Sequence, residues 1–288
     1  MAKNLGGVPK FSNSEANGMK VAVVGGGPSG LAATASLAQM GYAVDIFDAR
    51  DQLGGMMALI PDHRLDKKVM ETDIDFILSL GEISTKLGSK VEEPKDLLAQ
   101  GYNAVCIAAG LWDPIRLGIE NEDIAITMVD LLARPDAYDF DGRVAVIGGG
   151  ATALDSAIIA RVRGAKHVEL FMLETLAEMP LTTNERAELL DNDIEVNGRI
   201  RVSKINTNGK RIAGMETIKV ELPQDKSFAP ANVQDISGTE GVRTDVDDVI
   251  VAIGMRSTLA IDQTEGLFFA GDMASGPTTV VEASASGK

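Results

Sequence analysis

One local pattern occurs twice in this chain, and it constrains the fold more than any other feature. In each copy a short β-branched apolar run meets a cluster of glycines, and an alanine-rich stretch with helical spacing follows. The copies cover residues 20–47 and 143–172, and Gly41 and Gly164 end their helical stretches before a second strand-like run. Strand–helix–strand units of this kind build parallel sheets. The repeat therefore predicts an α/β chain with two Rossmann-like domains.

The first glycine cluster, GGGPSG at residues 25–30, has the spacing GxGxxG. In this motif Gly25 permits a tight turn, Gly27 lets the backbone approach a pyrophosphate, and Gly30 allows close helix–strand packing. The helix N-terminus that follows favours negative charge. Asp48 ends the next strand-like run, about 20 residues on, where a carboxylate accepts hydrogen bonds from ribose hydroxyls. A bare glycine-rich turn is the alternative, but the complete context predicts a dinucleotide site.

The second cluster, GGGATA at residues 148–153, has Ala153 as its third small residue. Glu174 follows about 20 residues later, after the next strand-like run. A carboxylate there binds ribose hydroxyls and repels a 2′-phosphate, so this site is expected to prefer NAD(H) over NADP(H). Arg161 and Arg163 stand at the far end of the expected helix, and we expect them on a solvated face.

Composition narrows the choice of partners. With 42 acidic and 27 basic residues, the 288-residue chain has a formal charge of −15, which disfavours nucleic acid and anionic membranes as partners. No apolar stretch is long enough to span a bilayer, and residues 1–19 lack the order of a signal peptide, so we expect a cytoplasmic protein. Cys106, the only cysteine, excludes an internal disulfide and an iron–sulfur ligand set; we expect it in the core.

Further segments share the pattern of one family. They are QLGG at 52–55, IP at 60–61, RL at 64–65, VCIAAG at 105–110, AEMP at 177–180, VIVAIG at 249–254, LFFAGD at 267–272, GP at 276–277 and VVEA at 280–283. In this order, over residues 20–288, they resemble the small subunit of glutamate synthase and the flavin portion of dihydropyrimidine dehydrogenase. That resemblance implies FAD on a split domain, with a nicotinamide domain inserted between its halves.

The expected domains are a flexible lead-in at 1–18, the first half of the FAD domain at 19–113, the NAD(H) domain at 114–255 and the second FAD half at 256–288. The motif and the resemblance together imply these FAD contacts: Gly25, Gly27, Pro28, Ser29, Gly30, Asp48, Ala49, Arg50, Gly54, Gly55, Met56, Arg64, Ala109, Gly110, Gly271, Asp272, Pro277, Thr278 and Thr279. The implied nicotinamide contacts are Gly148, Gly150, Ala151, Thr152, Ala153, Glu174 and Gly254. A helix opening near Thr278 is expected to point its N-terminus at the flavin ring.

The chain departs from that family in three respects. The single cysteine leads us to expect no cysteine-rich N-terminal iron–sulfur domain. Leu173 and Glu174 stand where the NADPH-dependent forms usually have two arginines. The sequence stops at Lys288, within the expected final helix, so we expect the second FAD half to be small.

The function predicted from these features is an FAD-dependent NAD(P)H oxidoreductase that prefers NADH. Hydride transfer between nicotinamide and flavin needs no side-chain acid or base, so no catalytic residue and no metal site are expected. Without a disulfide to receive electrons, we expect an iron–sulfur-cluster-bearing subunit of a larger complex as partner, as in glutamate synthase or an aldehyde-oxidising enzyme. The alternatives are a stand-alone flavin reductase or monooxygenase-like enzyme and a flavin-bearing structural subunit. The terminal substrate, the direction of electron flow, the partner's identity and stoichiometry, and FAD binding without a partner all stay open.

Overall fold

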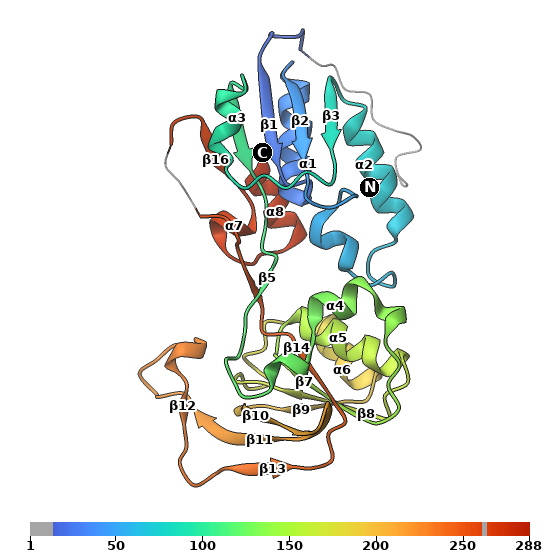
Figure 1. Cartoon of the computed structure of the whole chain (residues 1–288), viewed down its shortest axis with the longest axis vertical. Helices are drawn as coiled ribbons and strands as arrows, with labels where there is room; N and C mark the ends of the chain where they lie inside the picture. Colours follow the sequence, from blue (N-terminus) through green and yellow to red (C-terminus); the bar gives the residue numbers. More distant parts are fainter. Residues whose placement is uncertain (1–13, 261–263) are drawn as a thin grey trace. The chain divides into compact units, whose positions relative to one another are not determined.

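The computed structural model describes residues 14–260 and 264–288, which divide into two compact units (Figure 1). Unit 1 contains the chain up to Asp113 and again from Met255, and unit 2 is Pro114–Gly254. The chain passes from unit 1 to unit 2 within the short strand β5 (Asp113–Pro114) and returns to unit 1 at the start of β15 (Met255–Arg256). Each unit has a five-stranded parallel sheet with helices. The α/β fold class with two Rossmann-like units, one inserted into the other, is therefore confirmed.

Unit 1 has the strand order β16-β4-β1-β2-β3. The strands are β1 (Lys20–Val24), β2 (Ala43–Phe47), β3 (Ile83–Lys86), β4 (Ala104–Ile107) and β16 (Leu267–Phe269). The central strand β1 is buried on both faces: Ala22 packs with Val105 and Ile107, whereas Val23 packs with Val44 and Ile46. This two-sided burial explains why β1 is a continuous apolar run.

The helices of unit 1 begin at positions that the local sequence dictates. They are α1 (Pro28–Gln39), the 3-10 helix η2 (Gly55–Leu59), α2 (Lys67–Leu78), α3 (Lys95–Ala99), α7 (Asp272–Ser275) and α8 (Val280–Gly287). The first position of α1 suits Pro28, because the fixed φ of proline matches a helix and an N–H group at this position would have no partner within the helix. Asp66 caps α2, and Thr279 with Glu282 forms a capping box on α8.

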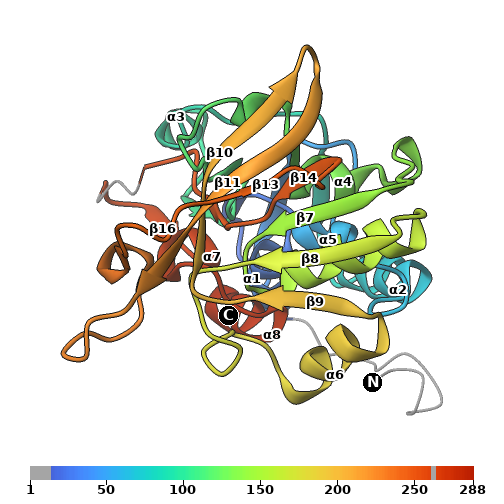
Figure 2. The ribbon, with the colours of Figure 1, turned by 90° about the horizontal axis from the view of Figure 1, so that it is seen from below.

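Unit 2 repeats the arrangement, with the strand order β6-β14-β7-β8-β9. Its parallel strands are β6 (Ile126–Thr127), β7 (Arg143–Ile147), β8 (His167–Phe171), β9 (Ile194–Asn197) and β14 (Asp248–Val251), and its helices are η3 (Glu122–Ile124), α4 (Met128–Ala133), η4 (Pro135–Ala137), α5 (Ala151–Val162) and α6 (Thr183–Asp191). Figure 2 shows β14, β7, β8 and β9 running side by side. Four strands correspond, β4-β1-β2-β3 in unit 1 and β14-β7-β8-β9 in unit 2, as the repeated sequence pattern predicts, whereas the edge strand is the last of the chain in unit 1 (β16) and the first in unit 2 (β6).

An antiparallel layer packs against one face of the unit 2 parallel sheet. It consists of β10 (Ile200–Asn208), β11 (Arg211–Glu221), β12 (Gln234–Asp235) and β13 (Gly241–Arg243), with η5 (Pro230–Asn232) between β11 and β12. Ile205 and Met215 of the hairpin pack against Ile147 and Phe171 of the parallel sheet. In the sequence, the Asn208-Gly209 pair between alternating apolar and polar residues is typical of a hairpin, and β10 and β11 form one around it. The composition of residues 223–241 is polar and typical of a loop, and this stretch also contains η5 and β12.

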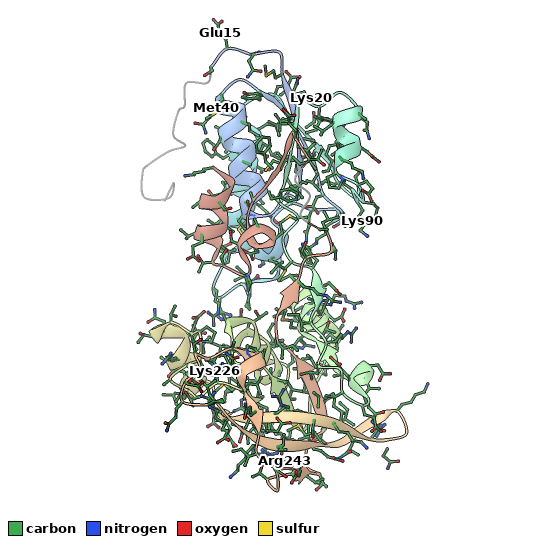
Figure 3. All side chains as sticks on the ribbon, turned by 90° about the vertical axis from the view of Figure 1, so that its left-hand side faces the viewer. Glu15, Lys20, Met40, Lys90, Lys226 and Arg243 are labelled. Carbon is green, nitrogen blue, oxygen red and sulfur yellow. The ribbon has the colours of Figure 1, made fainter. Side chains whose placement is uncertain are left out.

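The segment before β1 is anchored to the end of α1. Ser14 N–H donates to Gln39 O at 2.9 Å, and Asn17 N–H donates to Gly41 O at 3.0 Å. In Figure 3, Glu15 and Met40 lie at the end of unit 1 where β1 begins at Lys20. The lead-in expected at 1–18 falls outside the described residues over 1–13, and over 14–17 it has these backbone contacts.

Candidate functional site

Both glycine loops leave the carboxyl end of the central strand of their sheet. In unit 1 the strand order turns back on itself at β1, between β2 and β4, and in unit 2 it does so at β7, between β8 and β14. Open α/β sheets bind ligands in the crevice at such a switch point. Gly25 and Gly148 are the first residues after these two strands. The topology therefore puts both loops where a dinucleotide would bind.

Three small residues of the loops are required by the fold itself. Gly25 has φ +106° and Gly148 has φ +140°, and a Cβ on either would overlap a carbonyl oxygen, of Ala108 and Ala252 respectively. A Cβ on Gly30 would overlap the carbonyl oxygen of Gly25. These glycines permit the tight turn and the close helix–strand contact, and they would be needed without any ligand.

The second glycine of each loop has no such reason within the protein. Gly27 and Gly150 have ordinary extended conformations, with φ −79° and −91°. The nearest atom to a Cβ on Gly27 is the Gly55 Cα at 3.8 Å, and no atom among the described residues lies within 4 Å of a Cβ on Gly150. A Cβ would be tolerated sterically at both positions, so the protein itself does not require glycine there, whereas a ligand that approaches the backbone would. Both loops thus pass a test for pyrophosphate binding.

Asp48 lies against the first loop, as the motif predicts. Its carboxylate is buried and accepts hydrogen bonds from Gly26 N–H at 2.7 Å and from Arg50 N–H at 2.9 Å. Because each carboxylate oxygen has a second lone pair, both can also accept a ribose hydroxyl. Ala49 lies between these anchored residues in the turn after β2.

The loop that follows packs directly onto the first glycine loop. Gly54 N–H donates to Gly26 O at 2.8 Å, and a Cβ on Gly55 would come 2.8 Å from Gly27 Cα. Gly54 and Gly55 have φ +111° and +55°, which favours glycine at both positions. Met56 continues into η2, and Arg64 lies part-buried in the turn before α2.

Lys67 fixes this loop from the start of α2, and no sequence motif indicates this role. Its ammonium group donates to Met57 O at 3.2 Å and to Ile60 O. Burial lowers the pKa of Lys67, and the nearby Asp62 carboxylate opposes that effect. His63, in the same turn, is exposed to solvent.

The C-terminal residues of unit 1 meet the start of α1. A Cβ on Gly271 would lie 2.8 Å from the Ser29 Cβ, and one on Gly287 would overlap the Ser29 carbonyl. Ser29 is buried, and its Oγ has no hydrogen-bond partner among the described residues. Asp272 accepts hydrogen bonds from the N–H and Oγ1 of Thr278, at 3.2 and 2.6 Å. The polypeptide from Gly271 to Thr278 is thereby held beside the first glycine loop.

The remaining residues expected at the first site lie just after strand β4 or just before helix α8. Ala109 and Gly110 follow β4 and face the carboxyl edge of the sheet, with Gly110 at φ +68°. Pro277 and Thr279 flank Thr278 ahead of α8. The helix expected to open near Thr278 begins at Val280, because Thr279 and not Thr278 supplies the N-cap.

Glu174 lies against the second glycine loop. A Cβ on Gly149 would come 3.0 Å from the Glu174 Oε2, so the carboxylate borders the loop that would cradle a pyrophosphate. Ala151 and Thr152 open α5, and Ala153 is buried against Gly148. Gly254, with φ +105°, follows the carboxyl end of β14.

The loop after β8, which carries Glu174, is held by residues that the sequence did not single out. Arg199, from the turn between β9 and β10, donates to Leu173 O at 2.6 Å and pairs with Glu178 at 2.9 Å. The backbone N–H of Thr175, with Arg199 also contributing, lowers the pKa of Glu178. Arg186 of α6 donates to Met179 O at 2.9 Å. No spacing rule connects Arg199 to this loop, so only the fold reveals it.

Arg161 and Arg163 stay away from the second loop, as expected, although both are part-buried. Arg161 donates to Asn192 O at 3.1 Å, and Arg163 donates to Tyr138 O at 2.7 Å. The long side chains fasten the far end of α5 to its neighbours, because the carbonyl groups there accept hydrogen bonds. Both arginines are therefore structural contacts of α5.

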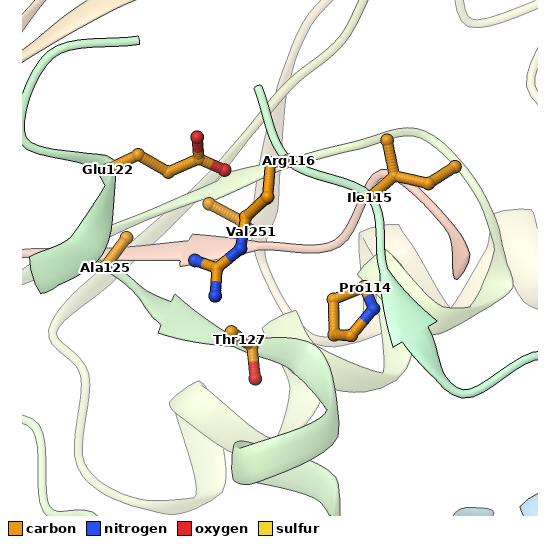
Figure 4. Close-up of a pocket in the computed structure, with 7 residues that line it drawn as sticks. All are labelled: Pro114, Ile115, Arg116, Glu122, Ala125, Thr127 and Val251. Carbon is orange, nitrogen blue, oxygen red and sulfur yellow. The ribbon is translucent and has the colours of Figure 1, made fainter. Parts of the chain in front are cut away.

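A small pocket lies elsewhere in unit 2 (Figure 4), lined by Pro114, Ile115, Arg116, Glu122, Ala125, Thr127 and Val251. The buried Glu122 carboxylate accepts hydrogen bonds from the N–H groups of Leu117 and Gly118, at 2.7 and 2.8 Å. This acid holds the chain that enters unit 2. None of the expected cofactor residues lines the pocket.

Two further findings apply to residues 14–260 and 264–288 alone. They contain no group of three or more side chains arranged to hold a metal ion. Every helix in them is too short or too polar to cross a lipid bilayer.

The fold and the loops define a two-domain dinucleotide-binding oxidoreductase. Residues 19–287 match the family described as pyridine nucleotide-disulphide oxidoreductase, and the chain belongs to that family. Membership supports binding of FAD and of a pyridine nucleotide.

Cys106, partly buried in β4, is the only cysteine in the sequence. Burial raises the pKa of its thiol to about 11.

Among curated proteins, the chain is 31% identical to the NADP(+)-dependent formate dehydrogenase subunit beta of Moorella thermoacetica, over 94% of this chain and 43% of that protein. It is 28% identical to the glutamate synthase [NADPH] small chain of Escherichia coli K12, over 88% of this chain and 58% of that protein. The chain thus spans about half the length of these relatives. The resemblance to the glutamate synthase small subunit is confirmed, whereas the names of both relatives contain NADP(+) or NADPH and do not support a preference for NADH.

Solved structures agree on the fold. FprA from Mycobacterium tuberculosis, in complex with NADPH, matches with a TM-score of 0.77 at 18% identity, over 93% of this chain and 82% of that one. Thioredoxin reductase from T. acidophilum matches with a TM-score of 0.69 at 18% identity, over 93% of this chain and 94% of that one. At this identity the likeness establishes the architecture alone.

Proposed function

We propose that unit 1 binds FAD, that unit 2 binds NAD(H), and that the chain transfers electrons between this nicotinamide and a partner subunit. The proposed FAD domain comprises residues 19–113 and 256–288, and the nicotinamide domain residues 114–255. The observation that carries the proposal is the open space beside Gly27 and Gly150, where the fold itself requires no glycine. Family membership supports the two cofactor classes.

The residues around each loop have separate tasks in this proposal. The backbone at Gly27 and the first turn of α1 would hold the FAD pyrophosphate, and Asp48 would hold the ribose. FAD, when bound, supplies hydride exchange with a nicotinamide and electron transfer to a partner. The chain's own part is to bind, orient and shield, so no side-chain acid or base is assigned.

For the nicotinamide, we propose that Glu174 makes NADH the preferred substrate. Its carboxylate borders Gly149, where a 2′-phosphate on the adjacent ribose would meet like charge. Arg199, whose guanidinium contacts this loop, is already engaged by Glu178 and the Leu173 carbonyl. The names of two relatives contain NADP(+) and NADPH, so a preference for NADH would distinguish this chain from them.

The test compares NADH and NADPH as reductants of the FAD-loaded protein under anaerobic conditions, followed by the visible flavin band. We expect NADH to act at lower concentration. The change Glu174→Arg should reverse the order, with about a 10- to 100-fold gain for NADPH relative to NADH. Glu195→Gln, on the exposed side of β9, is the control for a charge change in the same unit. Equal use of both nucleotides by the unchanged protein would refute the role of Glu174.

We further propose an iron–sulfur-cluster-bearing partner and a cytoplasmic location. The support is that the curated relatives are named as a subunit beta and a small chain. Co-purification with a cluster-bearing protein that is reduced when NADH is added would support the partner. Full turnover of a small substrate by the isolated chain would favour the stand-alone reductase, and bound flavin that neither nucleotide reduces would favour the structural subunit.

A further inference from the structure

The turn between β9 and β10 places Arg199 in a backbone conformation that favours glycine. Its φ is +56°, in the left-handed region, where a side chain costs free energy. Gly198, the residue before it, packs on the loop after β8, since a Cβ there would come 2.8 Å from the Glu174 carbonyl oxygen. The Arg199 N–H donates to the same oxygen at 3.1 Å. A strained residue beside the expected ribose site points to a task for its side chain.

Three groups hold the Arg199 guanidinium. Nη1 donates to Leu173 O at 2.6 Å, Nη2 pairs with Glu178 at 2.9 Å, and the centre of the Phe228 ring lies 5.8 Å from the guanidinium carbon. Glu178 is itself fixed, because its other carboxylate oxygen accepts from the N–H and the hydroxyl of Thr175, at 2.8 and 3.0 Å. Both side chains of the ion pair are less than one-third exposed. The pair is therefore held more firmly than two flexible charges at an open surface.

This pairing gives the two carboxylates of the loop after β8 different surroundings. Glu174 borders the second glycine loop, whereas Glu178 holds the arginine. Arginine is the side chain that best matches a phosphate, and in dinucleotide sites an arginine near the ribose accommodates the 2′-phosphate. Because the Arg199 backbone is hydrogen-bonded to Glu174, its long side chain starts beside the ribose that Glu174 is proposed to bind. The ion pair with Glu178 therefore occupies a cation that could otherwise serve a 2′-phosphate.

We propose that Glu178 is a second determinant of nucleotide selectivity, because it holds the Arg199 guanidinium and keeps it from pairing with the 2′-phosphate of NADP(H). This rests on the proposed binding of NAD(H) by unit 2. Without the Glu178 carboxylate, Arg199 keeps its backbone anchor at Glu174 and loses its counter-ion, which is unfavourable for a part-buried charge. A 2′-phosphate then supplies the counter-ion and offsets part of the repulsion from Glu174. Glu178 acts through Arg199 and is a positioning residue.

The experiment measures binding of NAD⁺ and NADP⁺ to the full chain by calorimetry, since these two ligands differ by the 2′-phosphate alone and do not reduce flavin. Glu178→Gln retains one carbonyl oxygen, which can accept from Thr175 or from Arg199 but not serve both as the carboxylate does. It should tighten NADP⁺ binding about 5- to 20-fold and change NAD⁺ binding less than about 2-fold. Arg199→Gln alone should give no gain for NADP⁺, and combined with Glu178→Gln it should abolish the gain. Glu195→Gln, which removes one exposed negative charge from β9, should leave the ratio unchanged.

The outcomes separate this proposal from the one it rests on. Glu178→Gln and Arg199→Gln break the same ion pair, so a loosened loop would affect both variants alike, whereas a released guanidinium favours NADP⁺ in the first alone. An equal gain in both variants, or no gain in Glu178→Gln, refutes the role of Glu178, and binding of NAD⁺ by the unchanged protein then leaves the nicotinamide site standing. If the unchanged protein binds neither nucleotide or prefers NADP⁺, the proposed function of unit 2 fails in whole or in its selectivity, and this proposal fails with it.

Discussion

Gly148 and Gly150 lie two positions apart in one loop, yet the structure gives them different tasks. Gly148 has φ +140°, and a Cβ there would overlap the Ala252 carbonyl oxygen. Gly150 has φ −91° and ψ 177°, with no described atom within 4 Å of a Cβ. The fold needs the first glycine but not the second, where we propose that a ligand approaches the backbone. Replacing each with alanine separates stability from binding.

The magnitudes follow from these environments. Alanine at 148 adds a strained backbone conformation and a clash with main chain, which together cost about 3 kcal/mol of the free energy of unfolding. For a unit of this size that lowers Tm by roughly 10 °C. Alanine at 150 changes stability by at most about 1 kcal/mol, because loss of a glycine helix cap opposes the gain from a less flexible unfolded chain. Displacing the pyrophosphate from its N–H donors should weaken NADH binding about 10- to 100-fold.

The assay pairs thermal unfolding with NADH titration for both variants. We expect Gly148→Ala to unfold at lower temperature, and Gly150→Ala to melt near the unchanged protein but bind NADH poorly. Gly27→Ala is the matching change in unit 1, where FAD affinity should fall with little change in Tm. Normal NADH binding by Gly150→Ala would refute the argument that this glycine faces the pyrophosphate.

Two further predictions concern titratable groups whose pKa values depend on the folded structure. Glu169 is buried between Arg143 and Arg243, whose hydrogen bonds outweigh burial and lower its pKa. Its stabilising effect should be present above the pKa it has in the unfolded chain and be lost as pH falls through the lower folded value. Glu169→Gln should cost about 3–5 kcal/mol in urea unfolding near neutral pH, and an unchanged midpoint would contradict this. Burial raises the pKa of Cys106 to about 11, so the stability it contributes should be lost as pH rises toward that value. At neutral pH the part-buried thiol should react with a maleimide much more slowly in the folded protein than in urea, and equal rates would contradict this.

The fold was largely predictable from sequence, because the features that decide it are local and repeated. A β-branched run that meets glycines and then an alanine-rich stretch specifies a strand, a tight turn and a helix, and the chain has this pattern at Gly25 and at Gly148. The hairpin around Asn208 has an equally local cause, an Asn-Gly pair between alternating residues. The antiparallel pairing of β12 with β11 was missed, since a two-residue strand has no periodicity of its own.

The site was predictable where a motif fixes the spacing and not where the fold brings distant residues together. Asp48 and Glu174 were found from their distance to the glycines, and both lie against the expected loops. Lys67 and Arg199 reach the loops from other elements, and no spacing rule connects them to a cofactor.

The central claim, a flavin on unit 1 that is reduced through a nicotinamide on unit 2, is tested most directly by anaerobic titration of the FAD-loaded chain with NADH. The account predicts one FAD per chain and loss of its visible band at one equivalent of NADH, with Gly150→Ala requiring much higher concentrations. Absence of bound flavin, or a band unaffected by NADH and by NADPH alike, would contradict it.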